Sequence, residues 1–248
     1  MITIKDPREL KSMRLAGRIV AEVLNELAVM VKPGVTTAAL DQFAENYLIN
    51  KGAIPAFKGY NGFPASICAS VNEEVVHGIP GTRRLKEGDI ISIDVGAFYE
   101  GYCGDAAITV AVGDVSKEAR TLIKVTEEAL YQGIKQAVAG ARLGMVSNAI
   151  QAHAEMYKFS VVRQYVGHGI GKQMHEDPPV PNYGRQDRGP VLEPGMTIAI
   201  EPMINIGVWE VVVKPDNWTV VTRDGKYSAH FEHTIAITEQ GPEILTRM

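Results

Sequence analysis

The sequence predicts one domain of mixed α and β structure, built from two pseudo-symmetric halves of about residues 1–113 and 114–248. The order helix, helix, strands occurs twice along the chain. The segment LKEGDIISID at 85–94 recurs as LEPGMTIAIE at 192–201, an offset of 107 residues. No linker rich in Ser, Gly or Pro separates the halves, so two copies of one unit are expected to pack around a common core.

Helix signals open the first half. Asp6 and Glu9 form a capping box around Pro7, which takes the first helical position. An apolar helical face follows as far as the break at 33–34, and a second helix is expected around 40–48. The first half therefore begins with two consecutive helices.

The second half repeats this pattern. A helix is expected from near Ser116 to about Ala139, with a break at Gly140 and then a helix that carries Val146 and Ile150. Strands are expected in the two halves at ASICASV (65–71), DIISIDV (89–95), FSVVRQYV (159–166) and MTIAIEPM (196–203).

The composition is that of an ordinary globular protein. Apolar residues make up 46% of the chain, charged residues 22%, and the net charge is −4 without a Lys/Arg block. Neither nucleic acid nor an anionic membrane is therefore expected as the main ligand. No apolar run is long enough for a spanning helix, and MITIKDPREL lacks the apolar stretch of a signal peptide. Cys68 and Cys103 are too few for a disulfide framework, so a reducing cytoplasm is the expected compartment.

Two aspartates end the segment DVGAFYEGYCGD, which follows the apolar DIISI. With a hairpin tip at 99–100, Asp94 and Asp105 are expected to face each other directly. Like charges there destabilise a sheet unless both bind a cation, although two surface acids on a hairpin are the simpler alternative. The repeat also places Asp94 and Glu201 at equivalent positions, each at the end of an apolar strand.

Further ligands follow in the second half. His168 lies between glycines in VGHGIGKQMHED, Glu201 follows the strand MTIAI, and Glu232 lies in AHFEHTIAI, where it shares a face with His230. Each residue alone has a simpler interpretation: His168 as a structural histidine, Glu201 as a solvated acid at a strand end, and Glu232 as a surface acid on an edge strand. Taken together, the charge of four carboxylates balances that of two divalent ions, and oxygen ligands with one imidazole suit Mn, Fe, Co or Zn. The expected chemistry is a bridging water, made nucleophilic at neutral pH, that attacks a carbonyl polarised by one metal. The candidate ligands are Asp94, Asp105, His168, Glu201 and Glu232.

This ordered set, with SVNEEVVHGIPG, YVGHGIGKQMHEDP, IAIEPM and HFEHTIAI, closely resembles bacterial-type type I methionine aminopeptidases of the M24 metallopeptidase family, over essentially the whole chain. The resemblance implies the α+β pita-bread fold, a curved antiparallel sheet flanked by helices, with a two-metal site between pseudo-symmetric halves. It also implies hydrolytic removal of the initiator methionine from nascent proteins whose second residue is small.

The resemblance assigns roles to the ligands. Asp94 is expected to chelate one metal, His168 and Glu201 the other, and Asp105 and Glu232 to bridge both. Glu201 is also expected to shuttle a proton from the bridging water.

The resemblance assigns substrate contacts as well. His175 is expected near the scissile carbonyl and His77 near the following peptide unit. An apolar, aromatic pocket suits a methionine thioether, although residues of these types are more often plain core. Met174 stands where some relatives have an aromatic residue, and Cys103 has no assigned role. The expected pocket residues are Phe57, Tyr60, Phe63, Cys68, Met174 and Trp218.

Three alternatives stay open beside this hypothesis: a peptidase of the same fold that cleaves Xaa-Pro bonds, a non-catalytic binding protein on this scaffold, and a metal-stabilised structural domain. Peptidases that cleave Xaa-Pro bonds usually carry an added N-terminal domain, and the non-catalytic binding proteins lack some of the metal ligands. The expected partner is the N-terminal methionine of nascent polypeptides, with ribosome association left open. No nucleic acid or membrane is required, and a monomer is the default. The sequence does not select among Co, Mn, Fe and Zn.

Overall fold

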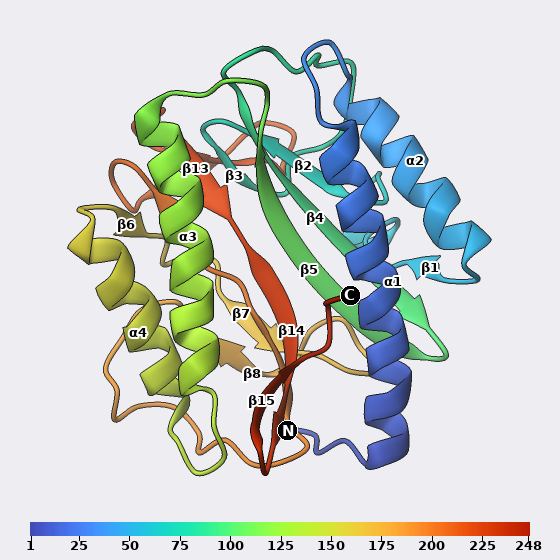
Figure 1. The fold of residues 1–248 in the computed structure, drawn as a ribbon, viewed down its shortest axis with the longest axis vertical. Helices are drawn as coiled ribbons and strands as arrows, with labels where there is room; N and C mark the ends of the chain where they lie inside the picture. The colour runs from blue at the N-terminus through green and yellow to red at the C-terminus, as the bar shows by residue number, and fades with distance from the viewer.

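The computed structural model describes residues 1–248, which form four α-helices, a short 3-10 helix and fifteen strands (Figure 1). The elements are α1 Pro7–Met30, α2 Thr37–Asn50, β1 Ile54–Pro55, the 3-10 helix η1 Tyr60–Gly62, β2 Cys68–Val71, β3 Glu74–Val76, β4 Ile90–Tyr99, β5 Tyr102–Ala111, α3 Lys117–Gln136, α4 Leu143–Met156, β6 Ser160–Val161, β7 Gly167–Gly169, β8 Glu176–Val180, β9 Thr197–Ile200, β10 Met203–Asn205, β11 Val211–Val213, β12 Val220–Thr222, β13 Ser228–His230, β14 Glu232–Thr238 and β15 Gly241–Ile244.

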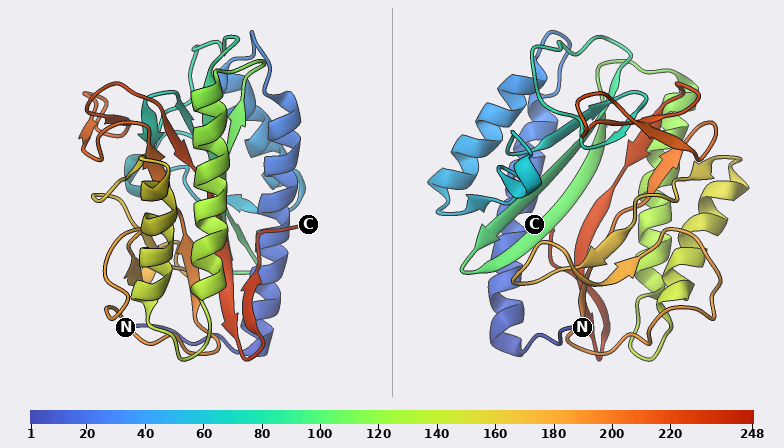
Figure 2. Two further views of the ribbon diagram at one scale, coloured as in Figure 1. Left: turned by 60° about the vertical axis from the view of Figure 1, so that its left-hand side comes forward. Right: turned by 180° about the vertical axis from the view of Figure 1, so that it is seen from behind.

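One nine-stranded antiparallel sheet runs through both halves of the chain in the order β1-β4-β5-β14-β9-β7-β8, with β2 paired to β4 and β15 to β14. Helices α1 and α2 lie on one side of the molecule and α3 and α4 on the other, all against the same face of the sheet (Figure 1). Seen from behind, the opposite face is left to strands and loops (Figure 2). This curled antiparallel sheet with flanking helices confirms the expected pita-bread architecture. No helix has both the length and the apolarity that crossing a membrane requires.

The two halves repeat each other in their contacts. The Gly34 N–H donates to the Leu85 carbonyl at 2.7 Å, and the Gly140 N–H donates to the Leu192 carbonyl at 2.8 Å. In each half this contact joins the loop between the two helices to the segment that precedes a central strand, β4 in the first half and β9 in the second. The repeat seen in the sequence is therefore a repeat of structure, and β5 and β14 meet side by side at its centre.

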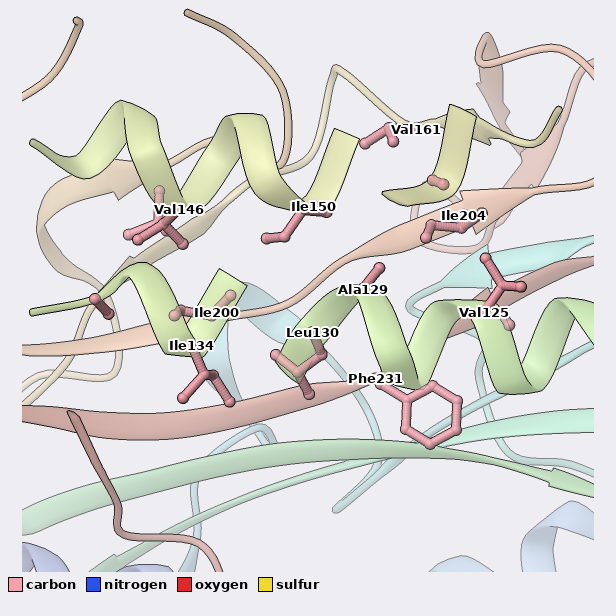
Figure 3. Packing of buried hydrophobic residues seen from close by; sticks show 14 of the residues in the cluster. Val125, Ala129, Leu130, Ile134, Val146, Ile150, Val161, Ile200, Ile204 and Phe231 are labelled. Atoms are coloured by element: carbon pink, nitrogen blue, oxygen red, sulfur yellow. The ribbon is translucent and has the colours of Figure 1, made fainter. Parts of the chain in front are cut away.

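A buried apolar cluster fixes α3 and α4 to the sheet (Figure 3). Ile134 of α3, Val146 and Ile150 of α4, and Ile200 of β9 belong to it, and all four are at most 5% exposed. Complete burial of such a side chain contributes about 1.5–3 kcal/mol. The strands that carry the candidate ligands therefore rest on a rigid layer.

The predicted helices are largely confirmed. The Asp6 carboxylate accepts the N–H groups of Arg8 and Glu9, and the Glu9 carboxylate accepts the Asp6 N–H at 2.9 Å, which completes the capping box. Helix α3 starts next to Ser116 as predicted, with Ser116 as its N-cap, but the predicted end near Ala139 was wrong. The helix stops at Gln136 because the next residue leaves helical backbone angles.

The strand predictions hold less well. The segment 159–166 was predicted as one strand, yet only Ser160 and Val161 pair, with β10. The chain bends after them, where Arg163 lies 4.7 Å above the ring of Trp209. The segment 196–203 divides into β9 and β10 at Glu201-Pro202, because a proline has no N–H for a ladder.

Replacing Gly17 with Ala is expected to destabilise the protein by about 1–3 kcal/mol, although Gly to Ala inside a helix normally stabilises by up to about 1 kcal/mol. The C-terminal segment after β15 passes helix α1 here so closely that an added Cβ would lie 2.7 Å from the Leu245 carbonyl carbon. The backbone at Leu245 cannot shift away from the added Cβ as a flexible side chain could. Urea unfolding measures the effect, and a higher unfolding midpoint for the variant would contradict it.

Gly133→Ala is the matched control. Its added Cβ would lie 2.8 Å from Ile150 Cδ1 and 3.4 Å from Val146 Cγ1, and these side-chain atoms can shift more easily than backbone. The control should therefore lose less stability than Gly17→Ala.

Candidate active site

Three neighbouring strands bring their acids to one face of the sheet. In the ladder Cys68 pairs with Asp94, Asp94 with Ala107, and Ala107 with Glu232. Side chains that are direct cross-strand neighbours point to the same face. Glu232 thus lies in the middle of the sheet, between β5 and β9, and the edge-strand alternative is excluded for it.

The predicted register of the Asp94–Asp105 hairpin was wrong. Asp94 faces Ala107 and Asp105 faces Gly96, so the two aspartates are diagonal neighbours. The turn lies at Glu100-Gly101, not at 99–100, because both residues adopt positive φ angles of 50° and 80°, as a two-residue hairpin turn requires. A shift of two residues keeps both side chains on one face. Asp94 also lies inside β4, which continues to Tyr99, and not at a strand end as expected.

The remaining candidate ligands converge on this face. Potential ligand atoms of Asp105, His168 and Glu232 lie within 4.8 Å of one another. The His168 Nε2 lies 3.7 Å from Glu201 Oε1 and 4.0 Å from Asp105 Oδ2. Nδ1 of His168 is 2.8 Å from the Gly169 carbonyl, and this bond fixes Nδ1 as the protonated nitrogen. Nε2 is left with its lone pair toward the carboxylates, as a metal ligand needs.

Burial makes this cluster costly without a cation. Burial is the main cause that raises the pKa of Asp94, Glu201 and Glu232 well above the usual range, and the charges of neighbouring acids are the second cause. Burial also raises the pKa of Asp105 to about 7. One carboxylate oxygen each of Asp94, Asp105 and Glu232 is buried without a hydrogen-bond partner. Oxygen atoms of this kind beside an imidazole fit divalent metal ions, which would remove both the repulsion and the unpaired atoms.

The acid cluster opens into a cavity of about 330 Å³. Every residue that the sequence analysis proposed for the site lines it, which places ligands, substrate histidines and pocket residues around one space. On its apolar wall, the ring of Phe63 meets Trp218 edge-on at 5.1 Å between centroids. The lining residues from the prediction are Phe57, Tyr60, Phe63, Cys68, His77, Asp94, Asp105, His168, Met174, His175, Glu201, Trp218 and Glu232.

His175 lies between the acid cluster and the pocket. Its Nδ1 shares a hydrogen bond of 2.8 Å with the Tyr60 hydroxyl, and its ring meets the His168 ring at 4.2 Å between centroids. With Nδ1 engaged, Nε2 is the nitrogen left to contact a bound molecule. Tyr60 therefore fixes the orientation of His175 as well as lining the pocket.

His77 is held in an unusual backbone conformation. Its φ of 59° is in the left-handed region, and its ring meets Tyr165 edge-on at 5.5 Å. Burial, with nearby His175 as the second cause, lowers the pKa of His77 to about 4. This side chain is therefore a neutral hydrogen-bonding group at neutral pH.

The metal-free protein should lose stability through His77 between pH 6.5 and pH 4. The unfolded chain binds a proton below about pH 6.5, whereas folded His77 resists it down to about pH 4, so the free energy of unfolding falls as pH drops through this window. The loss is on the order of 3 kcal/mol. Asn tolerates positive φ, so His77→Asn should lack this part of the pH dependence in urea unfolding. Parallel pH profiles for the two proteins would contradict the prediction.

Two residues at the site were not predicted from the sequence. His230 is 1% exposed, and its Nε2 lies 3.9 Å from Glu201 Oε2 and 4.0 Å from Glu232 Oε2 without a hydrogen-bond partner. The signal was present, because His230 lies two residues before Glu232 and was placed on its face without a role. Tyr165 lines the cavity beside His77 and precedes His168 by three residues.

The fold and the buried acid–imidazole cluster together define a metallopeptidase. The profile of Metallopeptidase family M24 matches residues 11–239. The chain is 59% identical over its whole length to methionine aminopeptidase 1 of Bacillus subtilis, and covers all of that protein. It superposes on the crystal structure of methionine aminopeptidase from Thermotoga maritima with a TM-score of 0.99 and 50% identity, each chain covered completely.

The chain belongs to family M24 as a bacterial type I methionine aminopeptidase. A Xaa-Pro dipeptidase from Bacillus anthracis is a more distant relative in structure. It shares 24% identity and a TM-score of 0.79, and the match covers 99% of this chain but 62% of the dipeptidase. That likeness shows a common fold alone.

Proposed function

We propose that this methionine aminopeptidase removes the initiator methionine from nascent chains whose second residue is small, with two divalent metal ions held by the acid cluster. The observation that carries the proposal is the single cavity of about 330 Å³, which has carboxylates and His168 on one side and an apolar, sulfur-containing and aromatic wall on the other. A methionine side chain against this wall would bring its peptide carbonyl to the acids.

Bound metals would supply Lewis acidity and a water activated at neutral pH. Asp94 would hold one ion, His168 and Glu201 the other, and Asp105 and Glu232 both. Their charge of −4 matches two divalent cations, whereas one ion would leave the site negative.

The chain's own residues then perform the proton transfers. Glu201 would accept a proton from the attacking water and deliver it to the leaving amine. His175, oriented by Tyr60, would donate a hydrogen bond to the carbonyl oxygen as negative charge develops there. His77 would contact the next peptide unit, where the rings of Tyr165 and Trp218 crowd the cleft and favour a small second side chain.

The partners follow from this substrate. Nascent chains as substrates would place the reaction in the cytoplasm, at or near the ribosome. The predicted ligands and pocket residues of this chain already share one cavity, and a monomer is the expected working unit.

The test is peptidase activity of metal-stripped protein on Met-Ala-Ser, on Met-Leu-Ser and on a matched Xaa-Pro peptide. Mn, Co, Fe and Zn are added back one at a time. The proposal predicts metal-dependent release of methionine, fastest from Met-Ala-Ser. Cleavage of the Xaa-Pro peptide instead, or tight metal binding without any cleavage, would contradict it.

A further inference from the structure

A buried ion pair lies directly behind His175, on the side away from the cavity. The Lys5 Nζ is 2.7 Å from Glu176 Oε2, and the two side chains are 5% and 11% exposed. Glu176 is the first residue of β8 and directly follows His175, and of the two only His175 lines the cavity. The position of Glu176 therefore sets the position of His175.

The polar partners of this pair hold the turn that carries the pocket residues. The Glu176 carboxylate accepts the Thr3 hydroxyl at 2.7 Å through Oε2 and the Gln173 N–H at 3.1 Å through Oε1. Lys5 Nζ also donates to the Thr3 hydroxyl, and the Lys5 N–H donates to the Gly195 carbonyl at 2.8 Å. Residues 3–5 thus join the 171–176 turn to the segment that leads into β9.

The backbone of this turn packs directly on the ion pair. A Cβ added to Gly171 would lie 2.6 Å from Lys5 Cε and 2.7 Å from Glu176 Oε1, so the Gly171 backbone lies against the charged ends of the pair. The Gly171 carbonyl in turn accepts the Cys103 N–H of β5 at 2.8 Å. The turn is held on one side by the strand of Asp105 and on the other by Lys5, and Met174 and His175 project from it into the cavity.

We propose that Lys5 is a positioning residue for the peptidase reaction: its buried pair with Glu176 fixes the 171–176 turn and so sets His175 at the reacting carbonyl. This rests on the proposed role of His175. The Lys5 side chain does not line the cavity, so we infer that it acts on His175 through the turn.

The experiment compares Lys5→Met, the double variant Lys5→Met/Glu176→Met, and Lys172→Met. Lys172 is the matched control because it lies on the same turn and pairs with Glu9 at 3.4 Å, but its side chain is 69% exposed. Such an exposed ion pair contributes little to the stability of the turn, so its loss should change kcat less than about 2-fold. Lys5→Met should lower kcat on Met-Ala-Ser about 10- to 100-fold with KM changed less than about 3-fold, because a small misplacement of a catalytic group acts on the transition state.

The double variant separates positioning from stability. An apolar pair of similar volume leaves no unpaired buried charge, so the thermal midpoint should return close to that of the wild type. The proposal predicts that kcat stays low. Recovery of kcat together with stability would mean that the pair is only structural, and an unchanged kcat in Lys5→Met would overturn the proposal equally. Should Lys5→Met fail to fold, the double variant decides.

The ring 1H–15N signals of His175, followed in protein labelled at histidine, do not depend on turnover. They should shift in Lys5→Met and in the double variant but not in Lys172→Met. A wild-type protein that releases no methionine would refute the proposed function, whereas unmoved His175 signals in an active protein would refute only the role of Lys5.

Discussion

Asp105→Asn is expected to lower kcat/KM for methionine release by about 10³-fold or more, because metal-based charge stabilisation contributes several kcal/mol to such reactions. Asp105 is 4% exposed and lies within reach of both His168 and Glu232. Asn preserves its shape but lacks the charge and one ligand oxygen. Steady-state kinetics with Met-Ala-Ser at saturating metal, together with a metal titration, measure the effect.

The variant should fold normally. Removal of one of four mutually repelling buried acids should leave the metal-free variant at least as heat-stable as the metal-free wild type. Asp114→Asn is the control, since Asp114 is 87% exposed and pairs only with Arg120 at 2.8 Å. Full activity in Asp105→Asn would exclude this residue from the metal site.

Glu201→Gln is expected to reduce kcat by about 10²- to 10⁴-fold, the usual contribution of a general acid–base group. Glu201 Oε1 faces His168 and Oε2 faces His230, so Gln can occupy the same space but cannot accept the proton. KM should change much less than kcat, because the methionine pocket is untouched. Single-turnover kinetics at saturating metal separate this loss of chemistry from weaker metal binding.

Glu193→Gln, at an exposed position shortly before β9, provides the comparison for Glu201→Gln and should leave kcat unchanged. A fall of less than about 10-fold in Glu201→Gln, with its metals bound, would move the proton transfer to another group.

The fold could be predicted because the repeat is carried by glycines and apolar residues with defined structural tasks. Gly88 and Gly195 have φ angles of 89° and 90° at equivalent turns before β4 and β9. A positive φ angle favours glycine at both positions, so the repeat can be recognised in the sequence. The turn at Glu100-Gly101 was missed because a non-glycine residue there takes a positive φ. The site prediction survived this error because side chains in strands alternate with a period of two.

The candidate ligands could be found because four acids and a histidine beside apolar strands form one set that suits metal ions, although each residue alone has a simpler explanation. No role was predicted for His230, because its burial beside Glu201 depends on the pairing of β13 with β10, and the local sequence pattern does not reveal that pairing. Lys5 looks like a surface residue at the start of the chain. Its partner Glu176 is 171 positions away, and only the folded structure brings the two together.

We expect this acid cluster to hold two metal ions. The most direct test is calorimetric titration of the metal-free protein with Mn²⁺ or Co²⁺, followed by anomalous diffraction from the loaded crystal. Two ions per chain are expected, about 3.5–4 Å apart, between Asp94 and His168. A single ion at saturation in a fully active protein would contradict it.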